Sequence, residues 1–178
     1  MHSTKPKLNL LAIDIGNSRI KLYKGNRLFS ISNKSDIELT LMDYLCNNCS
    51  NQIVYSSVNK QSEQILLEVL YRLKIDYIKV EELIDKSTKI DFSSVSGMGT
   101  DRKLGLISAA KLVPPPIITI DFGTCITINI VDENFKCIGG HIIPGLITQT
   151  KALNTFTSAL PQIMLNYTEN LIGTDTES

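Results

Sequence analysis

A repeat within the chain relates two segments that lie far apart in the sequence. Residues 10–30 (LLAIDIGNSRIKLYKGNRLFS) align with residues 117–137 (IITIDFGTCITINIVDENFKC) at an offset of 107 positions. Each copy begins with an apolar strand pattern that ends in Asp-x-Gly and a polar residue, and a second strand, a turn and a third strand follow. Two copies of this pattern predict two homologous half-domains.

Strand and helix patterns alternate between the copies, which is typical of an α/β fold. Three prolines at 114–116 form a stiff joint before the second copy, so we predict half-domains at 8–113 and 117–178. In the first, the pattern predicts a buried strand at 50–58, a helix at 61–73, a strand at 75–81 and a helix at 101–112. In the second, it predicts strands at 117–121, 125–131 and 134–138, a loop at 139–146 and then helical sequence.

The second half-domain is much the shorter, with 62 residues after Pro116. A sheet of several strands needs helices to cover it, so we expect this half to be incomplete. Its sheet would then expose an apolar face and an unpaired edge, which favours association with another chain.

Composition excludes several classes of protein. The 178 residues are 43% hydrophobic and 20% charged, as in ordinary globular domains, and 18 basic residues balance 18 acidic ones. With no basic excess, nucleic acid is not expected as a partner. No apolar run is long enough for a membrane span or a signal peptide, so we expect a cytoplasmic protein without a membrane partner. The cysteines at 46, 49, 125 and 137 are expected to be free thiols.

The segment DIGNSRIK (14–21) follows the first strand. Gly16 and the small polar residues after it allow backbone N–H groups to approach a phosphate closely. Asp14 would act through a cation, most simply hydrated Mg²⁺, while Lys21 is able to neutralise phosphate charge. A plain hairpin is the structural alternative. The second copy, DFGT at 121–124, favours phosphate binding, because a nucleotide cleft needs two opposed phosphate turns.

Two further motifs contain closely spaced glycines. In GMGTDRK (97–103), Arg102 would bind a substrate carboxylate and Asp101 would accept a hydrogen bond from the attacking hydroxyl; the alternative is that Asp101 is a helix N-cap. The segment GGHIIPGL (139–146) reads as a loop that enters a helix, and its alternative is a tight strand-to-helix connection. A lone histidine is more often structural than catalytic, so a structural role is expected for His141.

These four motifs, DIGNSRIK, GTDRK, DFGTCIT and GGHIIPGL, resemble in order and spacing those of type III pantothenate kinases, and the resemblance covers residues 10–178. That family belongs to the acetate and sugar kinase, Hsp70 and actin superfamily. The resemblance implies an α/β fold of two ribonuclease-H-like half-domains. It also implies ATP-dependent phosphorylation of pantothenate, the first step of coenzyme A biosynthesis, with Mg²⁺, a monovalent cation (K⁺ or NH₄⁺) and a homodimer.

The resemblance also implies a role for each matching residue. Asp101 is the general base, and Asp121 binds the monovalent cation. Thr124 contacts ATP. The ATP phosphates are bound by Asp14, Ile15, Gly16, Asn17, Ser18, Arg19, Ile20 and Lys21. Pantothenate lies on Gly99, Thr100, Asp101, Arg102 and Thr176. Phe92 stands where the family usually has Tyr, so ring packing against pantothenate is expected without the phenol hydrogen bond.

Two other functions fit part of the sequence. A non-catalytic relic of such a kinase, acting as a binding or regulatory protein, fits the short second half. A sugar or acetate kinase, or an Hsp70-like ATPase, shares the phosphate turns but does not account for GTDR.

Overall fold

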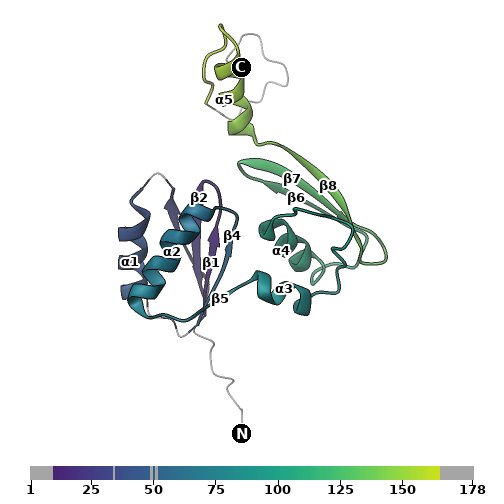
Figure 1. Ribbon diagram of the computed structural model, residues 1–178. Coiled ribbons are helices and arrows are strands. Elements are labelled where there is room, and N and C mark those ends of the chain that lie inside the picture. Colours follow the sequence, from purple (N-terminus) through teal and green to yellow (C-terminus); the bar gives the residue numbers. More distant parts are fainter. Residues whose placement is uncertain (1–9, 34, 49, 51, 165–178) are drawn as a thin grey trace. The chain divides into compact units, whose positions relative to one another are not determined.

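A computed structural model describes residues 10–164 apart from 34, 49 and 51 (Figure 1). The chain forms two compact units. The first takes in the residues up to Lys89 together with Gly97–Ile107, and the second takes in Ile90–Ser96 together with the residues from Ser108 onward. Each unit contains one β-sheet, so the protein is of the mixed α/β class.

The first unit has a five-stranded mixed sheet in the order β3-β2-β1-β4-β5. The first three strands pair antiparallel as a meander, whereas β4 runs parallel to β1 and β5 runs parallel to β4. Each parallel connection passes through a helix, and Figure 1 shows both helices on one face of the sheet. The elements are β1 (Leu10–Ile15), β2 (Arg19–Lys24), β3 (Arg27–Ser32), α1 (Ile37–Asn47), β4 (Gln52–Ser57), α2 (Lys60–Leu73) and β5 (Tyr77–Lys79).

The core of this unit lies between the sheet and these two helices. Alternate residues of β1, namely Leu11, Ile13 and Ile15, are buried against apolar residues of α2 such as Leu66 and Leu70. The residues between them therefore point to the opposite face, because successive strand side chains alternate. Asp14 lies on that second face.

The predicted strand at 50–58 and helix at 61–73 are confirmed as β4 and α2. The strand predicted at 75–81 is wrong in its second part, because β5 ends at Lys79 and the helix α3 (Glu81–Ser87) begins two residues later. Glu81 and Glu82 favour a helix start, since acidic side chains stabilise the positive end of the helix dipole. The helix predicted at 101–112 is confirmed as α4 (Thr100–Ala109), followed by a turn.

The second unit contains a three-stranded antiparallel meander of β6 (Ile117–Phe122), β7 (Cys125–Val131) and β8 (Cys137–Pro144), followed by α5 (Leu146–Phe156). The predicted loop at 139–146 is wrong, because residues 139–144 belong to β8. Gly140 makes this pairing possible, since a Cβ there would collide with the backbone carbonyl of Ile128 on β7. The third strand begins at Cys137 rather than at 134, because Asp132 closes a turn by accepting the Lys136 N–H at 2.8 Å.

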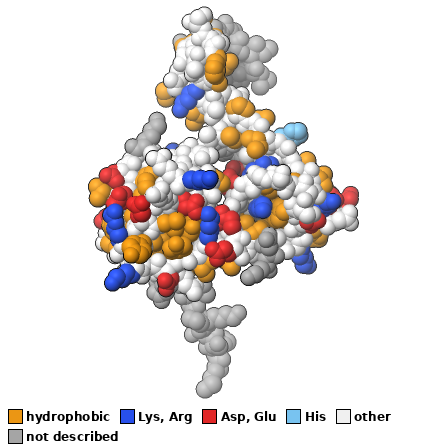
Figure 2. Space-filling model, in the orientation of Figure 1, with side chains coloured by type: hydrophobic (Ala, Val, Ile, Leu, Met, Phe, Trp, Pro, Cys, Tyr) orange, Lys and Arg blue, Asp and Glu red, His pale blue; other side chains and the backbone are white. Residues whose placement is uncertain are grey.

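Part of the second sheet is apolar and exposed. Ile118, Ile120 and Phe122 alternate along one face of β6 and are 65%, 55% and 71% exposed. Leu146 and Ile147 of α5 are exposed as well, and Figure 2 shows hydrophobic side chains at the surface of this unit. An exposed apolar face of the second sheet was expected from the sequence, and it is present among the described residues.

The described cysteines, at 46, 125 and 137, are free thiols, as predicted. Cys49 lies outside the described residues. Within residues 10–164, no helix combines the length and the apolar character that crossing a membrane requires.

Candidate functional site

Asp14 lies between two polar neighbours on adjacent strands. In the sheet it is opposite Lys21 on β2 and Ser56 on β4. The Ser56 hydroxyl donates to Asp14 Oδ1 at 3.1 Å, and Lys21 Nζ lies 3.8 Å from Oδ2. Both charged side chains are more than a third exposed, so the ion pair adds little stability. Its effect is to hold a carboxylate and an ammonium group together at the end of β1.

Asn33, directly after β3, fixes the turn that follows Asp14. Its Nδ2 donates to the carbonyls of Gly16 and Asn17 at 3.2 and 2.8 Å, and its backbone N–H donates to the carbonyl of Ser18 at 3.1 Å. Because N–H and C=O point in opposite directions across a trans peptide, the amides of residues 17–19 point away from Asn33. Successive amides on one side of a turn form an anion-binding concavity. No pattern in the sequence indicates this role of Asn33.

Gly16 has a different part in this turn from the one expected. Its own N–H donates to the Arg19 carbonyl at 3.0 Å, so that amide is used inside the turn. A Cβ at Gly16 would lie 3.2 Å from the same carbonyl, which is tighter than usual packing. Phosphate binding would therefore fall to the amides of residues 17–19.

The Gly-Thr-Asp-Arg segment begins helix α4. The Lys103 N–H donates to the Gly99 carbonyl at 3.2 Å, so Gly99 immediately precedes the helix. The alternative in which Asp101 is the N-cap is therefore wrong, because Asp101 lies within the first turn. Its side chain is exposed, and its Oδ1 accepts the Arg102 N–H at 2.8 Å. A Cβ at Gly99 would lie 2.5 Å from that oxygen, so glycine makes room for the carboxylate.

Val58, directly after β4, borders both segments. Its N–H donates to the carbonyl of Ile15, the last residue of β1, at 3.0 Å. Its Cγ1 lies 3.6 Å from the position that a Cβ of Gly99 would occupy. The Asp14 turn and the start of α4 therefore lie at the same edge of the sheet, at the carboxyl ends of the parallel strands β1 and β4. Ligands of open α/β sheets bind at such edges.

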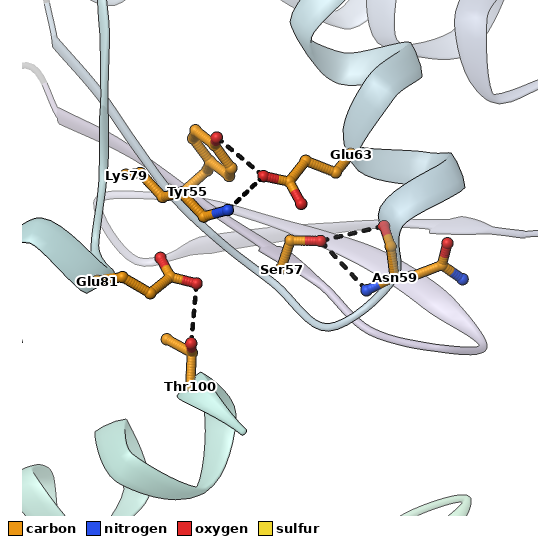
Figure 3. A network of polar contacts seen from close by, with 7 residues as sticks. All are labelled: Tyr55, Ser57, Asn59, Glu63, Lys79, Glu81 and Thr100. Atoms are coloured by element: carbon orange, nitrogen blue, oxygen red, sulfur yellow. Dashed lines mark hydrogen bonds and ion pairs between the residues drawn. The ribbon is translucent and has the colours of Figure 1, made fainter. Parts of the chain in front are cut away.

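A polar network, drawn in Figure 3, lies next to this edge. Tyr55 and Lys79 bond to Glu63 Oε1 at 3.1 and 2.6 Å, which ties β4 and β5 to α2. The Thr100 hydroxyl at the start of α4 donates to Glu81 Oε1 at the start of α3, at 2.8 Å. No sequence pattern indicates Glu63 or Glu81, because the Lys79–Glu63 contact joins residues 16 positions apart and the Thr100–Glu81 contact joins residues 19 positions apart.

The titratable groups of this network shift one another's pKa values. Burial alone would raise the pKa of Glu63, but the hydrogen bonds from Lys79 and Tyr55 outweigh it and lower that pKa. The bond to Glu63 raises the pKa of Lys79. Burial, and then the bond to Glu63, raises the pKa of Tyr55. At neutral pH the network therefore holds a carboxylate, an ammonium group and a neutral phenol.

The second unit contains the other Asp-x-Gly turn. Here Asp121 is opposite Thr127, so the residue that faces it is not basic, unlike Lys21 opposite Asp14. The repeat keeps the offset of 107 on the first strand but needs 106 on the second, because the second turn is one residue shorter. Asp14 therefore faces an ammonium group on the neighbouring strand, whereas Asp121 does not.

Helix α5 begins directly against this second turn. The N–H of Gly145 donates to the Thr124 carbonyl at 2.9 Å, and the Thr148 hydroxyl donates to the same carbonyl at 2.7 Å. A Cβ at Gly145 would collide with the backbone carbonyls of Gly123 and Thr124. Glycine at 145 is thus what lets the helix approach the turn.

The remaining predicted residues are distributed as follows. Phe92 is half-buried and belongs to the second unit, whereas Gly99–Arg102 belong to the first. His141 is exposed on β8, and Thr176 lies outside the described residues. Across residues 10–164 no three His, Cys, Asp or Glu side chains gather into a metal site. Asp14 fits Mg²⁺ as a single carboxylate, because Mg²⁺ is often held by one or two carboxylates together with substrate phosphates.

A mixed α/β fold with strand-end aspartate turns and a Gly-Thr-Asp-Arg helix start is typical of a kinase. Comparison with known proteins gives the family. The family model described as type III pantothenate kinase matches residues 10–178, so the chain belongs to the type III pantothenate kinase family.

Curated relatives support this assignment. The chain is 29% identical to a type III pantothenate kinase of Sulfurihydrogenibium sp., over 95% of this chain and 73% of the relative. It is 31% identical to that of Finegoldia magna, over 94% and 70% of the two chains, and 35% identical to that of Gloeobacter violaceus, over 87% and 63%.

Proposed function

We propose that this chain transfers the γ-phosphoryl group of ATP to the primary hydroxyl of pantothenate, giving 4'-phosphopantothenate in the first step of coenzyme A biosynthesis. The observation that carries the proposal is the position of Val58, which hydrogen-bonds to the end of β1 and contacts the start of α4. A phosphate turn and a loop with adjacent carboxylate and guanidinium groups thereby share one edge of one sheet. That is the arrangement that transfer of a phosphoryl group to a hydroxyl requires.

In this proposal the turn amides of residues 17–19 and the Lys21 ammonium group bind the ATP phosphates. Lys21 is half exposed and able to offset charge that develops on the transferred group. Asp14 would hold Mg²⁺ together with the phosphates, and the bound ion neutralises charge on the β- and γ-phosphates.

Asp101 and Arg102 act on pantothenate. Arg102 binds its carboxylate through the two parallel N–H donors of the guanidinium group. Asp101 orients the primary hydroxyl and accepts its proton as the oxygen bonds to phosphorus and ADP leaves. Because the transition state is loose, the proton moves late and orientation is the larger contribution. The family resemblance assigns Gly99, Thr100, Phe92 and Thr176 to pantothenate binding as well.

Two residues of the second Asp-x-Gly turn also have roles in this proposal. Thr124 contacts ATP, and Asp121 binds the monovalent cation, K⁺ or NH₄⁺. The absence of a basic residue opposite Asp121 supports this difference from Asp14.

We also infer two ribonuclease-H-like half-domains, divided at the prolines 114–116. The strand order β3-β2-β1-β4-β5 supports this inference for the first half, and the three-stranded meander β6-β7-β8 repeats the beginning of that sheet.

A homodimer and a cytoplasmic location complete the proposal. The exposed isoleucines of β6 support association, which light scattering tests directly: a monomer at micromolar concentration would refute the dimer.

The test of function is an assay of ADP release with pantothenate, acetate, glycerol and glucose as acceptors. We expect activity with pantothenate alone, together with a product of the mass of 4'-phosphopantothenate. Activity with another acceptor would identify a different kinase of the superfamily. ADP release that no acceptor accelerates would indicate an ATPase, and pantothenate binding without turnover would indicate a non-catalytic protein.

A further inference from the structure

The first turns of α3 and α4 are joined by one side-chain hydrogen bond. Glu81 and Thr100 are the first residues of the two helices, and the Thr100 hydroxyl donates to Glu81 Oε1 at 2.8 Å (Figure 3). Thr100 is 91% buried by its surroundings, being 9% exposed. Hydrogen bonds to a carboxylate are stronger than neutral ones, and burial strengthens them further.

The Glu81 carboxylate is attached to a well-anchored part of the first unit. Directly before it, the Val80 N–H donates to the Tyr55 carbonyl on β4 at 2.8 Å. Lys79, one residue earlier, bonds to Glu63 on α2 at 2.6 Å. The start of α3 is therefore fixed to both the sheet and α2, so Glu81 transmits their position to Thr100.

Glu81 Oε2 is also buried, and in the described part of the chain it accepts no hydrogen bond. An unsatisfied buried carboxylate oxygen is costly, because it has lost its hydrogen bonds to water without gaining a partner. A contribution to stability does not explain why an unsatisfied carboxylate oxygen is buried at this place. A role in positioning the neighbouring residues that are proposed to bind pantothenate does explain it.

We propose that Glu81 is a positioning residue, whose carboxylate holds the first turn of α4 through Thr100 and so orients Asp101 and Arg102 toward pantothenate. This inference rests on the proposed function. It assigns Glu81 no contact with substrate. The turn at 16–19 is held by Asn33 instead, so we expect nucleotide binding to be independent of Glu81.

Steady-state kinetics of Glu81→Leu test the inference. A displacement of about 1 Å in reacting groups can cost on the order of 100-fold in rate, so we expect kcat/KM for pantothenate to fall by about 10- to 100-fold. KM for ATP should change by less than about twofold, and Glu81→Gln, which keeps the acceptor oxygen, should recover most of the loss. A merely structural residue would instead lower the active fraction, and with it kcat, leaving both KM values unchanged.

Glu82→Leu is the matched control, since it removes the same charge from the same helix turn at an exposed position. It should leave the kinetics of pantothenate unchanged. In a double-mutant cycle, the effects of Thr100→Val and Glu81→Leu should combine to less than their product, because both changes remove the same bond. The inference would be overturned if the effects of the two changes on kcat/KM for pantothenate simply multiplied, or if Glu81→Leu had the kinetics of the parent.

Hydrogen exchange separates this inference from the proposed function. Loss of the Glu81 contact should speed exchange of the Lys103 amide, whose bond to Gly99 closes the first turn of α4. Unchanged exchange would refute the contact whatever the enzyme's activity. A parental protein that does not phosphorylate pantothenate would refute the proposed function, and the exchange result would still decide whether Glu81 holds α4.

Discussion

Replacement of Gly145 by alanine should separate helix α5 from the second Asp-x-Gly turn. The backbone of Gly145 has an ordinary extended conformation (φ −69°, ψ 164°), so alanine causes no strain there by itself. The added methyl group would instead collide with two backbone carbonyls, those of Gly123 and Thr124. Backbone atoms cannot rotate away as a flexible side chain can, so α5 must shift.

That shift breaks two hydrogen bonds to the Thr124 carbonyl, one from the Gly145 N–H and one from the Thr148 hydroxyl. Each is worth about 0.5–1.5 kcal/mol, and overpacking costs about 1–3 kcal/mol more. We therefore expect the free energy of unfolding to fall by roughly 2–6 kcal/mol. Since Thr124 is proposed to contact ATP, KM for ATP should rise.

Gly105→Ala is the matched control for this change. Gly105 lies inside α4, and a Cβ there would meet no atom within 4 Å. Alanine in a helix interior is favoured over glycine by about 0.5–1 kcal/mol, so this variant should be stabilised. Urea unfolding followed by circular dichroism measures both variants, because the chain has no Trp to report by fluorescence. Equal stability of Gly145→Ala and the parent would refute the reasoning.

Three further predictions concern titratable groups. Asp101→Asn should keep pantothenate binding within about tenfold but lose roughly 10²- to 10⁴-fold in kcat, as expected for a missing general base; parental turnover would remove that role. Asp121→Ala should abolish the dependence of the rate on K⁺, and an unchanged K⁺ dependence would show that the cation binds elsewhere. Glu63 has a lowered pKa in the folded protein, so its ion pair with Lys79 stabilises at neutral pH and that stabilisation is lost as the pH falls through the folded pKa. Glu63→Gln should thus be less stable than the parent at neutral pH, and the difference in urea unfolding should shrink as acid protonates Glu63 in the folded protein; a constant difference would contradict this.

Local sequence patterns determined a large part of this protein. The apolar alternation of β1 and β4 and the helical spacing of α2 predicted these elements correctly, because each pattern reflects which face of a single element is buried. The Asp-x-Gly turns and the Gly-Thr-Asp-Arg segment identified the family for the same reason: their chemistry lies within a few consecutive residues. The short helix α3 and the extension of β8 were missed. The apolar residue Val80 favours continuing the strand, and Gly139 favours a loop, but the packed structure has a helix after the first and a strand through the second.

Strand pairing and side-chain contacts were decided by the tertiary structure alone. The sequence repeat aligns Asp14 with Asp121, but the one-residue difference between the two turns places Lys21 opposite the first and Thr127 opposite the second. Register depends on how the turn closes as well as on the pattern of the strand residues, so an alignment of the strand residues alone could not show it. The contact of Glu81 with Thr100 joins residues 19 positions apart, and only the packed fold brings such residues together.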